Sequence, residues 1–585
     1  MARHRPTIRS ILCVALLFVS AAEARAGIRA DFEMDRDPEL RVPAEVSVFP
    51  GRLRPLWFEA LQRPEADMQR MAADAIGTGH RAGVPDLTGA IPRLVEILTA
   101  AESHPAARLA AARALISLDA RDAAPQLAQS AEQFGADLKQ IVEPALADWS
   151  YEPLRRVWES RLKAPATRRR DLLLAIDGLS TTGDAPALPA LLELVHDPLQ
   201  TPDARTAAAR AAGIIEDQGL EADAERLIAG APAVPVLNRL CAVRLVARHS
   251  AEHSLNLLSQ FAVDAEPAVA IVALTRLIEI APQRVVPIAE SAMKNADPLV
   301  RQRGAQAYVL YPDPQRVVIL AQLLDDPHPD VRGAVRDWLF DLRLRPELVD
   351  PILATATEIL AGDRWRGLEQ AALLLGAMDH KPVATRLVTL LESKRPEVGI
   401  AAAWALKRLA VPETLPPMFD KAVRQTELRA KPGELPRGLD LQTAHLIEAF
   451  GRMKYAAAEP LLVRYIPKNP LYGEFSRSAA IWTLGHLHEG TPDESLAAQL
   501  LARVTDDNPM PPEWDRVRAM SALSIGRMKA VSQVPALKKY IGPRIPAALF
   551  GVAIRWALIE LTGEPIPEPE SPRSRKKRWF LEPLE

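Results

Sequence analysis

The chain has 585 residues, which exceeds the length that one hydrophobic core usually serves, so we expect several domains or a repeat array. Its 48% apolar and 25% charged residues exclude a disordered protein, and the 72 basic and 74 acidic residues leave no overall field that would attract nucleic acid or an anionic membrane. Aromatic residues make up 5%, whereas Ala and Leu dominate long stretches, which favours packed helices over sheets.

Residues 1–26 are predicted to be a signal peptide. The basic stretch Arg3–Arg9 is followed by the apolar run Ile11–Ala22 and by Ala24-Arg25-Ala26, which has the small-residue pattern of a cleavage site. The alternative is a membrane anchor, but the apolar run is shorter than the about 20 residues that span a bilayer. We therefore expect cleavage near Ala26 and an exported chain, periplasmic or secreted, without a transmembrane segment.

Residues 56–562 contain an internal repeat, preceded by a polar segment, residues 27–55, that we expect to lie extended along the first repeat. Seven repeat segments align on a proline, and most then carry an apolar, a small and a large residue two, six and ten positions later. These positions share one face of a helix, and small residues let that helix approach a neighbour closely. The aligned prolines are Pro105, Pro202, Pro235, Pro267, Pro298, Pro329 and Pro396.

A second apolar run precedes several of these segments and ends in an Asp/Pro turn. Together with the openings Asp297-Pro298-Leu299-Val300-Arg301 and Pro329-Asp330-Val331-Arg332, this pattern resembles the HEAT repeat family, especially the bacterial HEAT-like repeats of phycobilisome lyases. The resemblance implies an all-α fold, an α-α superhelix of about 13–14 helical-hairpin repeats. It also implies that helix arginines such as Arg108 and Arg205 join neighbouring repeats in a ladder.

Two parts of the chain depart from the pattern. Residues 411–438 are poorly periodic and contain Pro and Gly, so we predict a loop inserted between repeats. Residues 563–585 are rich in Pro and Glu and then carry the basic run Arg573–Arg578, so we predict a mobile tail. A basic tail can meet nucleic acid or anionic lipid, but in an exported protein we interpret it as solvated or as docked on a partner.

The sequence offers little evidence of catalytic or metal chemistry. The common hydrolase, metalloprotease, phosphate-binding and dinucleotide-binding motifs are not found. His249 and His253 have a spacing that zinc accepts, and His486 and His488 form an H-x-H, but neither pair has a third ligand nearby. We therefore interpret these histidines as solvated turn residues. Cys241, the one cysteine beyond the signal peptide, occupies the small position of its repeat and is predicted to be a buried hydrophobe rather than a nucleophile.

A group of Arg and Trp residues is the candidate binding site. Arg336 places a charge one position after the small residue, where most aligned segments have Ala, and Trp338 stands two positions further on. Trp365 and Arg366 open the following segment. Because Trp and Arg are frequent interface anchors, we predict a protein-binding patch in the concave groove. The alternative is that the tryptophans fill gaps in the core and the arginines extend along apolar surface.

These observations predict a non-catalytic, exported HEAT-repeat scaffold that binds another protein or peptide along its concave surface. We predict no cofactor, no metal, no catalytic residue and no nucleic-acid partner. Two alternatives remain open. The resemblance to lyase-type repeats implies a protein that handles a chromophore or cofactor, although an exported chain with a single cysteine suits bilin attachment poorly. The other alternative is a structural element of the cell envelope.

Overall fold

The computed structural model describes residues 27–46, 49–229, 234–429, 435–469, 471–541, 545–572 and 579–582. The predicted signal peptide and the basic run Arg573–Arg578 lie outside these ranges. Regular secondary structure within them is helical, which confirms the all-α fold. The chain forms two compact units: an N-terminal stack, residues 46–310 with the tail after 572, and a C-terminal stack, residues 311–572 with residues 27–45.

The helices of the N-terminal stack are α2 (Leu53–Gln62), α3 (Ala66–Arg81), α4 (Ile91–Thr99), α5 (Pro105–Ser117), α6 (Ala124–Phe134), α7 (Ala136–Asp148), α8 (Pro153–Lys163), α9 (Arg169–Thr182), α10 (Leu188–His196), α11 (Pro202–Ile215), α12 (Glu221–Ile228), α13 (Val236–Val246), α14 (Glu252–Phe261), α15 (Pro267–Ile280), α16 (Ala289–Ala292) and α17 (Pro298–Leu310).

The helices of the C-terminal stack are α18 (Pro314–Ala321), α19 (Pro329–Leu342), α20 (Pro346–Ala361), α21 (Trp365–Ala377), α22 (Ala384–Leu390), α23 (Pro396–Leu409), α24 (Leu415–Arg429), α25 (Leu439–Arg452), α26 (Glu459–Val463), α27 (Glu474–Leu487), α28 (Glu494–Val504), α29 (Asp515–Arg527), α30 (Val534–Ile541) and α31 (Leu549–Thr562).

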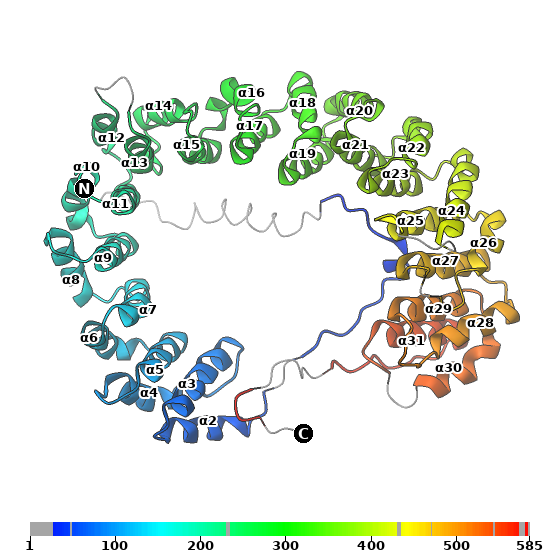
Figure 1. Ribbon diagram of the computed structural model, residues 1–585, viewed down its shortest axis with the longest axis horizontal. Coiled ribbons are helices and arrows are strands. Elements are labelled where there is room, and N and C mark those ends of the chain that lie inside the picture. Colours follow the sequence, from blue (N-terminus) through cyan, green and yellow to red (C-terminus); the bar gives the residue numbers. More distant parts are fainter. Residues whose placement is uncertain are drawn as a thin grey trace, which may run out of the picture. The chain divides into compact units, whose positions relative to one another are not determined.

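The described residues form fifteen helical pairs, each an even-numbered first helix followed by an odd-numbered second helix. Within each stack the second helices of successive repeats pack on one another, and Figure 1 shows them on the inner side of each curved stack. We expected 13–14 repeats, and the second helix that we missed is α7. Pro144 lies inside it, and the buried Lys139 and Glu143 interrupt its apolar pattern.

The aligned prolines begin second helices, as predicted: six of the seven occupy the first helical position, and Pro235 caps α13. Proline suits this position because the first N–H groups of a helix have no partner within it. Small residues then allow close packing. A Cβ on Gly213 of α11, for example, would lie 2.5 Å from the carbonyl oxygen of Arg244 on α13.

The arginine ladder has rungs within repeats as well as between them. Arg108 Nε donates to the carbonyl oxygen of Leu98 (3.1 Å), and Arg205 Nε donates to that of Val195 (2.9 Å). Each acceptor lies in the last turn of a first helix, where carbonyl groups lack partners in their own helix. Arg205 also donates to Asn238 Oδ1 of the next repeat at 2.9 Å. The arginines therefore join the two helices of a repeat and, where a partner follows, two repeats.

The loop predicted at residues 411–438 is largely wrong, because Leu415–Arg429 forms the first helix α24. Pro416 and Pro417 occupy its first turn, which tolerates proline, and they made the sequence look irregular. The array begins at Leu53, slightly before the expected residue 56, and ends at Thr562 as expected. None of the described helices is both long enough and apolar enough to cross a membrane.

Candidate peptide-binding face of the C-terminal stack

The segment Ile28–Asp37 lies across the second helices of the C-terminal stack. Its hydrogen bonds and ion pairs reach α19, α23, α25, α27 and α29, and Figure 1 shows it beside α25 and α27. We expected this segment along the first repeat, and for these residues that prediction is wrong. The segment alternates acidic and apolar side chains, and their basic and aromatic partners stand on the later repeats. We call these inner surfaces of α19–α29 the segment face.

Phe32 and Met34 anchor the segment. They are 7% and 1% exposed. The Phe32 ring stacks on the His445 ring of α25 and on the Phe475 ring of α27, with centroids 4.4 and 5.0 Å apart. Burying a side chain of this size contributes about 1.5–3 kcal/mol. The two anchors therefore supply most of the apolar contribution to docking.

Beneath Phe32 lies a buried charged cluster of Lys407, His445 and Glu448. Lys407 Nζ is 2.7 Å from Glu448 Oε2 and 3.4 Å from His445 Nδ1, and these side chains are at most 1% exposed. Burial lowers the pKa of His445, so its ring is neutral at pH 7. Burial opposes the ionisation of Glu448, but its hydrogen bond with His445 and the charge of Lys407 outweigh this and lower its pKa. The cluster is therefore an ion pair with a neutral imidazole beside it.

Five side chains of the segment face bind the main chain of the segment, among them Asp337, which accepts from the Ile28 N–H, and Arg527, which donates to the Asp37 carbonyl oxygen. Lys407 Nζ donates to the carbonyl oxygen of Asp31 (2.8 Å), and Trp482 Nε1 donates to that of Asp37 (3.1 Å). Glu448 Oε1 accepts from the backbone N–H of Met34 (2.9 Å). Because these hydrogen bonds involve backbone groups, they fix the course of the main chain and do not select for particular side chains. Lys407 and Glu448 are thus satisfied by one another and by the segment.

The acidic residues of the segment meet cations on successive helices. Arg452 Nη1 lies 2.6 Å from Glu33 Oε1, and Arg516 Nη1 lies 2.8 Å from Asp35 Oδ1. Asp37 is held by His486 Nε2 at 2.8 Å and by Arg527 Nη2 at 3.0 Å. The hydrogen bond from His486 and the charge of Arg527 lower the pKa of Asp37 against the opposing effect of burial. The segment face is therefore complementary to a negatively charged strand.

Of the four histidines predicted to be solvated, His253 is exposed, whereas His249, His486 and His488 are buried or half-buried and paired. His486 contacts Asp37 as described, and His488 Nε2 lies 2.9 Å from Glu459 Oε1. His249 is fully buried, with Glu221 Oε1 3.2 Å from its Nδ1, and His253 is exposed and paired with Glu225. Within the described ranges no group of His, Cys, Asp and Glu has the geometry of a metal site. Cys241 is buried as predicted, and burial raises the pKa of its thiol.

The predicted Arg/Trp group is brought together in part. Arg366 lies 5.0 Å from the centre of the Trp365 ring, which Arg332 of α19 and Arg395 also approach, at 5.8 and 5.0 Å. Arg336 instead pairs with its neighbour Asp337 (2.8 Å) and donates to Gln370 Oε1 of α21 (3.0 Å). Trp338 is half-buried on α19, and no ring contact or hydrogen bond among the described residues joins it to the other three.

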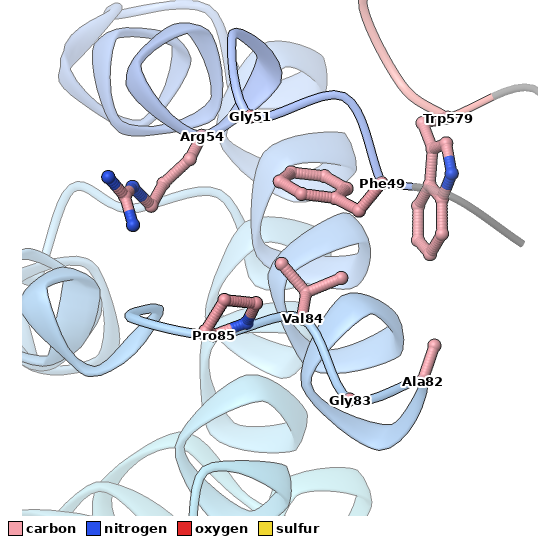
Figure 2. A pocket seen from close by; sticks show the side chains of 8 residues that line it. All are labelled: Phe49, Gly51, Arg54, Ala82, Gly83, Val84, Pro85 and Trp579. Carbon is pink, nitrogen blue, oxygen red and sulfur yellow. The ribbon is translucent and has the colours of Figure 1, made fainter.

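A separate aromatic cavity of about 360 Å³ lies in the N-terminal stack. Figure 2 shows Phe49 and Val84 beside it, with Trp579 next to Phe49 and Arg54 on the other side. Trp57 Nε1 of α2 donates to the carbonyl oxygen of Phe580 at 2.7 Å. The tail was predicted to be mobile, but at residues 579–580 it packs on α2, because the centre of the Trp579 ring lies 5.8 Å from that of the Trp57 ring and the Phe580 carbonyl accepts from Trp57. The cavity carries little charge and has no cluster of reactive groups.

Comparisons with known proteins agree with this architecture. A model of HEAT repeats matches residues 254–339. No curated protein matches the sequence. The fold is similar to importin β crystallised in an ammonium sulfate condition, with 13% identity, 87% of this chain and 72% of that chain covered, and a TM-score of 0.51.

Two further similar structures contain Kap95p. In one, binding of Kap95p induces the switch loops of RanGDP to adopt the GTP-bound conformation (13% identity, 87% and 72% covered, TM-score 0.55). The other is a complex of Kap95 and Nup1 (14% identity, 87% and 73% covered, TM-score 0.50). At these identities the likeness concerns the fold. The repeat pattern, the paired helices and the family match together show an α-solenoid fold that contains HEAT repeats at residues 254–339.

Proposed function

We propose that this protein is an exported, non-catalytic scaffold whose segment face binds an extended, acidic stretch of another protein. The observation that carries the proposal is the way in which the C-terminal stack holds Ile28–Asp37. Side chains from several repeats bind the main chain, pack around an aromatic anchor and pair with acidic residues. A partner with an aromatic residue between acids would make the same contacts after displacing the segment.

The fold supports this reading. Stacked helical pairs present long inner surfaces that suit extended partners, and Kap95, a protein of similar fold, is found in a complex with Nup1. In the present chain the complementary charge of the segment face limits the partner class. The segment face carries Arg452 on α25 and Arg516 and Arg527 on α29, each paired with an acidic residue of the segment. These cations would repel a basic segment.

A labelled peptide with the sequence of residues 27–38 tests the proposal in trans. In the full mature chain, Phe32→Ala should release the internal segment, because it removes the ring stacked on His445 and Phe475. We expect this variant to bind the peptide at least about tenfold more tightly than the wild type in fluorescence anisotropy, a difference of about 1.4 kcal/mol. Asp37→Asn should act in the same direction more weakly.

The controls separate binding from misfolding. Adding Arg527→Ala to Phe32→Ala should abolish peptide binding, since it removes the cation that holds the acid at the end of the segment. A peptide with Ala in place of both Phe32 and Asp37 should not bind. Equal affinity of the wild type and Phe32→Ala, with circular dichroism showing both to be folded, would overturn the proposal. The same variants then serve as baits in pull-downs from the exported fraction. The Phe32→Ala variant should recover more of the partner than the wild type, and the variant that also carries Arg527→Ala should recover none.

A further inference from the structure

The segment begins against a carboxylate of α19. The backbone N–H of Ile28 donates to Asp337 Oδ1 at 3.1 Å. A Cβ on Gly27 would lie 2.0 Å from Asp337 Oδ2, so a residue other than glycine would have to displace this carboxylate. The Gly27 nitrogen is one bond of about 1.46 Å from the same Cα, so it too lies beside this carboxylate. The structure thus places residue 27, where cleavage of the signal peptide is predicted, against the partly exposed carboxylate of Asp337.

The two oxygens of Asp337 have different surroundings. Oδ1 accepts from Ile28 and from Arg336, whose Nε and Nη2 are 2.9 and 2.8 Å away. Arg336 is itself held by Gln370 Oε1 of α21 at 3.0 Å. Oδ2 is the oxygen that faces Gly27. The carboxylate is therefore fixed in place by α19 and α21, with one oxygen directed at the first residue of the predicted mature chain.

We propose that cleavage between Ala26 and Gly27 creates an α-ammonium group that pairs with Asp337 and thereby fastens the segment to its face. The inference rests on the export that is part of the proposed function. A leader peptidase adds water across the amide: the hydroxyl joins the Ala26 carbonyl carbon and a proton joins the Gly27 nitrogen. The new acid then gives its proton to the new amine, since an α-amino group has a pKa of about 7.7–8.0. A neutral amide beside Asp337 becomes a cation.

This ion pair assigns a role to Arg336, which orients Asp337 in addition to any contact with a partner. It also makes docking of the segment dependent on removal of the leader. An uncleaved chain keeps a neutral amide at Gly27 and lacks the charged contact, so its segment face is more open. Cleavage would then regulate access to the face on which the proposed partner binds.

Three forms of the full chain test the inference: one with a free Gly27 amine, made with a site-specific protease that leaves glycine first, one with acetylated Gly27, and one that retains Ala24-Arg25-Ala26. Hydrogen exchange of the amides of residues 28–37 is the readout. We expect exchange about fivefold slower in the free-amine form than in the other two, as suits a partly exposed ion pair. Acetylation removes the charge without adding residues and so separates charge from length.

Asp337→Asn should abolish the difference between the free and acetylated forms, whereas Asp350→Asn, at an exposed acid of α20, should leave it intact. Equal exchange in the free and acetylated forms would overturn the inference, as would a difference that survives Asp337→Asn. An exported protein whose N-terminal residue, determined by mass spectrometry, is not Gly27 would also overturn it. Binding of the peptide in trans is a separate readout, so failure of this ion pair and failure of the proposed function give different results.

Discussion

The second helices of the two stacks share one repeat pattern but differ in how much of each helix is buried. In the C-terminal stack, residues 401–407, 442–451, 476–485 and 519–527 are buried without interruption. In the N-terminal stack, α11 keeps Arg210 exposed and α5 keeps Arg113 exposed on the side away from the first helices. Among the described residues no segment crosses α5–α17 as Ile28–Asp37 crosses the later helices. A repeat helix that is buried on every side therefore marks a covered inner face.

The composition of the two inner faces explains the difference. Trp404 stands eight residues after Pro396, where α5 and α11 place the exposed Arg113 and Arg210. Lys407, His445, Glu448 and Trp482 add further large polar groups to the later helices. Trp404, Lys407, Glu448 and Trp482 each have a polar atom that the segment satisfies, and the His445 ring stacks on Phe32. Large polar groups on an inner face need an occupant because burial without a partner costs free energy. The large polar groups of the occupied face therefore match the segment that covers them.

The largest effect should come from breaking the buried ion pair. Lys407→Met leaves Glu448 buried without its cation, which typically costs about 3–5 kcal/mol. We expect a lower urea midpoint for the C-terminal stack. Tryptophan fluorescence and hydrogen exchange of α23 and α25 measure this midpoint. Arg210→Met, which removes an exposed pair with Asp177 in the N-terminal stack, should change stability by less than about 1 kcal/mol. Similar losses in both variants would contradict the distinction between the two faces.

Acid should weaken the occupied face selectively. Burial lowers the pKa of His445 in the folded protein, so the unfolded chain binds its proton first and stability falls as pH drops below the usual histidine pKa of 6.5. The lowered pKa of Asp37 acts in the same direction at lower pH, below the usual aspartate pKa of 3.8. Each group can contribute at most about 1.4 kcal/mol per pH unit.

Urea titrations between pH 7 and pH 5 should therefore show a falling midpoint for the C-terminal stack, and His445→Gln should flatten that dependence. The N-terminal stack provides the internal reference. A midpoint independent of pH over this range in the wild type would show that protonation of His445 is not coupled to folding of the stack.

The smallest effect concerns the predicted Arg/Trp group. Trp365→Ala removes a ring that three arginines approach, and cation–π contacts at partly exposed sites contribute about 0.5–1 kcal/mol. Exchange of the amides of residues 28–37 should stay unchanged, since no ring contact or hydrogen bond among the described residues joins Trp365 to the segment. Faster exchange of the segment would place Trp365 within the segment face after all.

The fold could be predicted from the sequence because the proline, small and large positions recur with the period of a helical pair. The segment face could not. Phe32 and Met34 are separated from their partners by hundreds of residues, and nothing in a polar stretch indicates which repeat it will meet. A usable signal was nevertheless present: Leu439–Arg452 and Glu474–Leu487 lack a continuous polar side, which a helix open to solvent requires. Arg336 could be identified from the sequence because it breaks the repeat pattern, and Asp337, with which it pairs in the structure, is the next residue in the chain.

The segment also has a mechanical consequence. The curvature of a solenoid follows from small rotations between repeats, and such stacks bend when those rotations change. A strand bonded to α19, α23, α25, α27 and α29 resists any change that moves these helices apart. The segment therefore makes the C-terminal stack more resistant to bending. The N-terminal stack keeps the flexibility of an ordinary repeat array. Releasing the strand would free a binding surface and soften that half of the molecule in a single step.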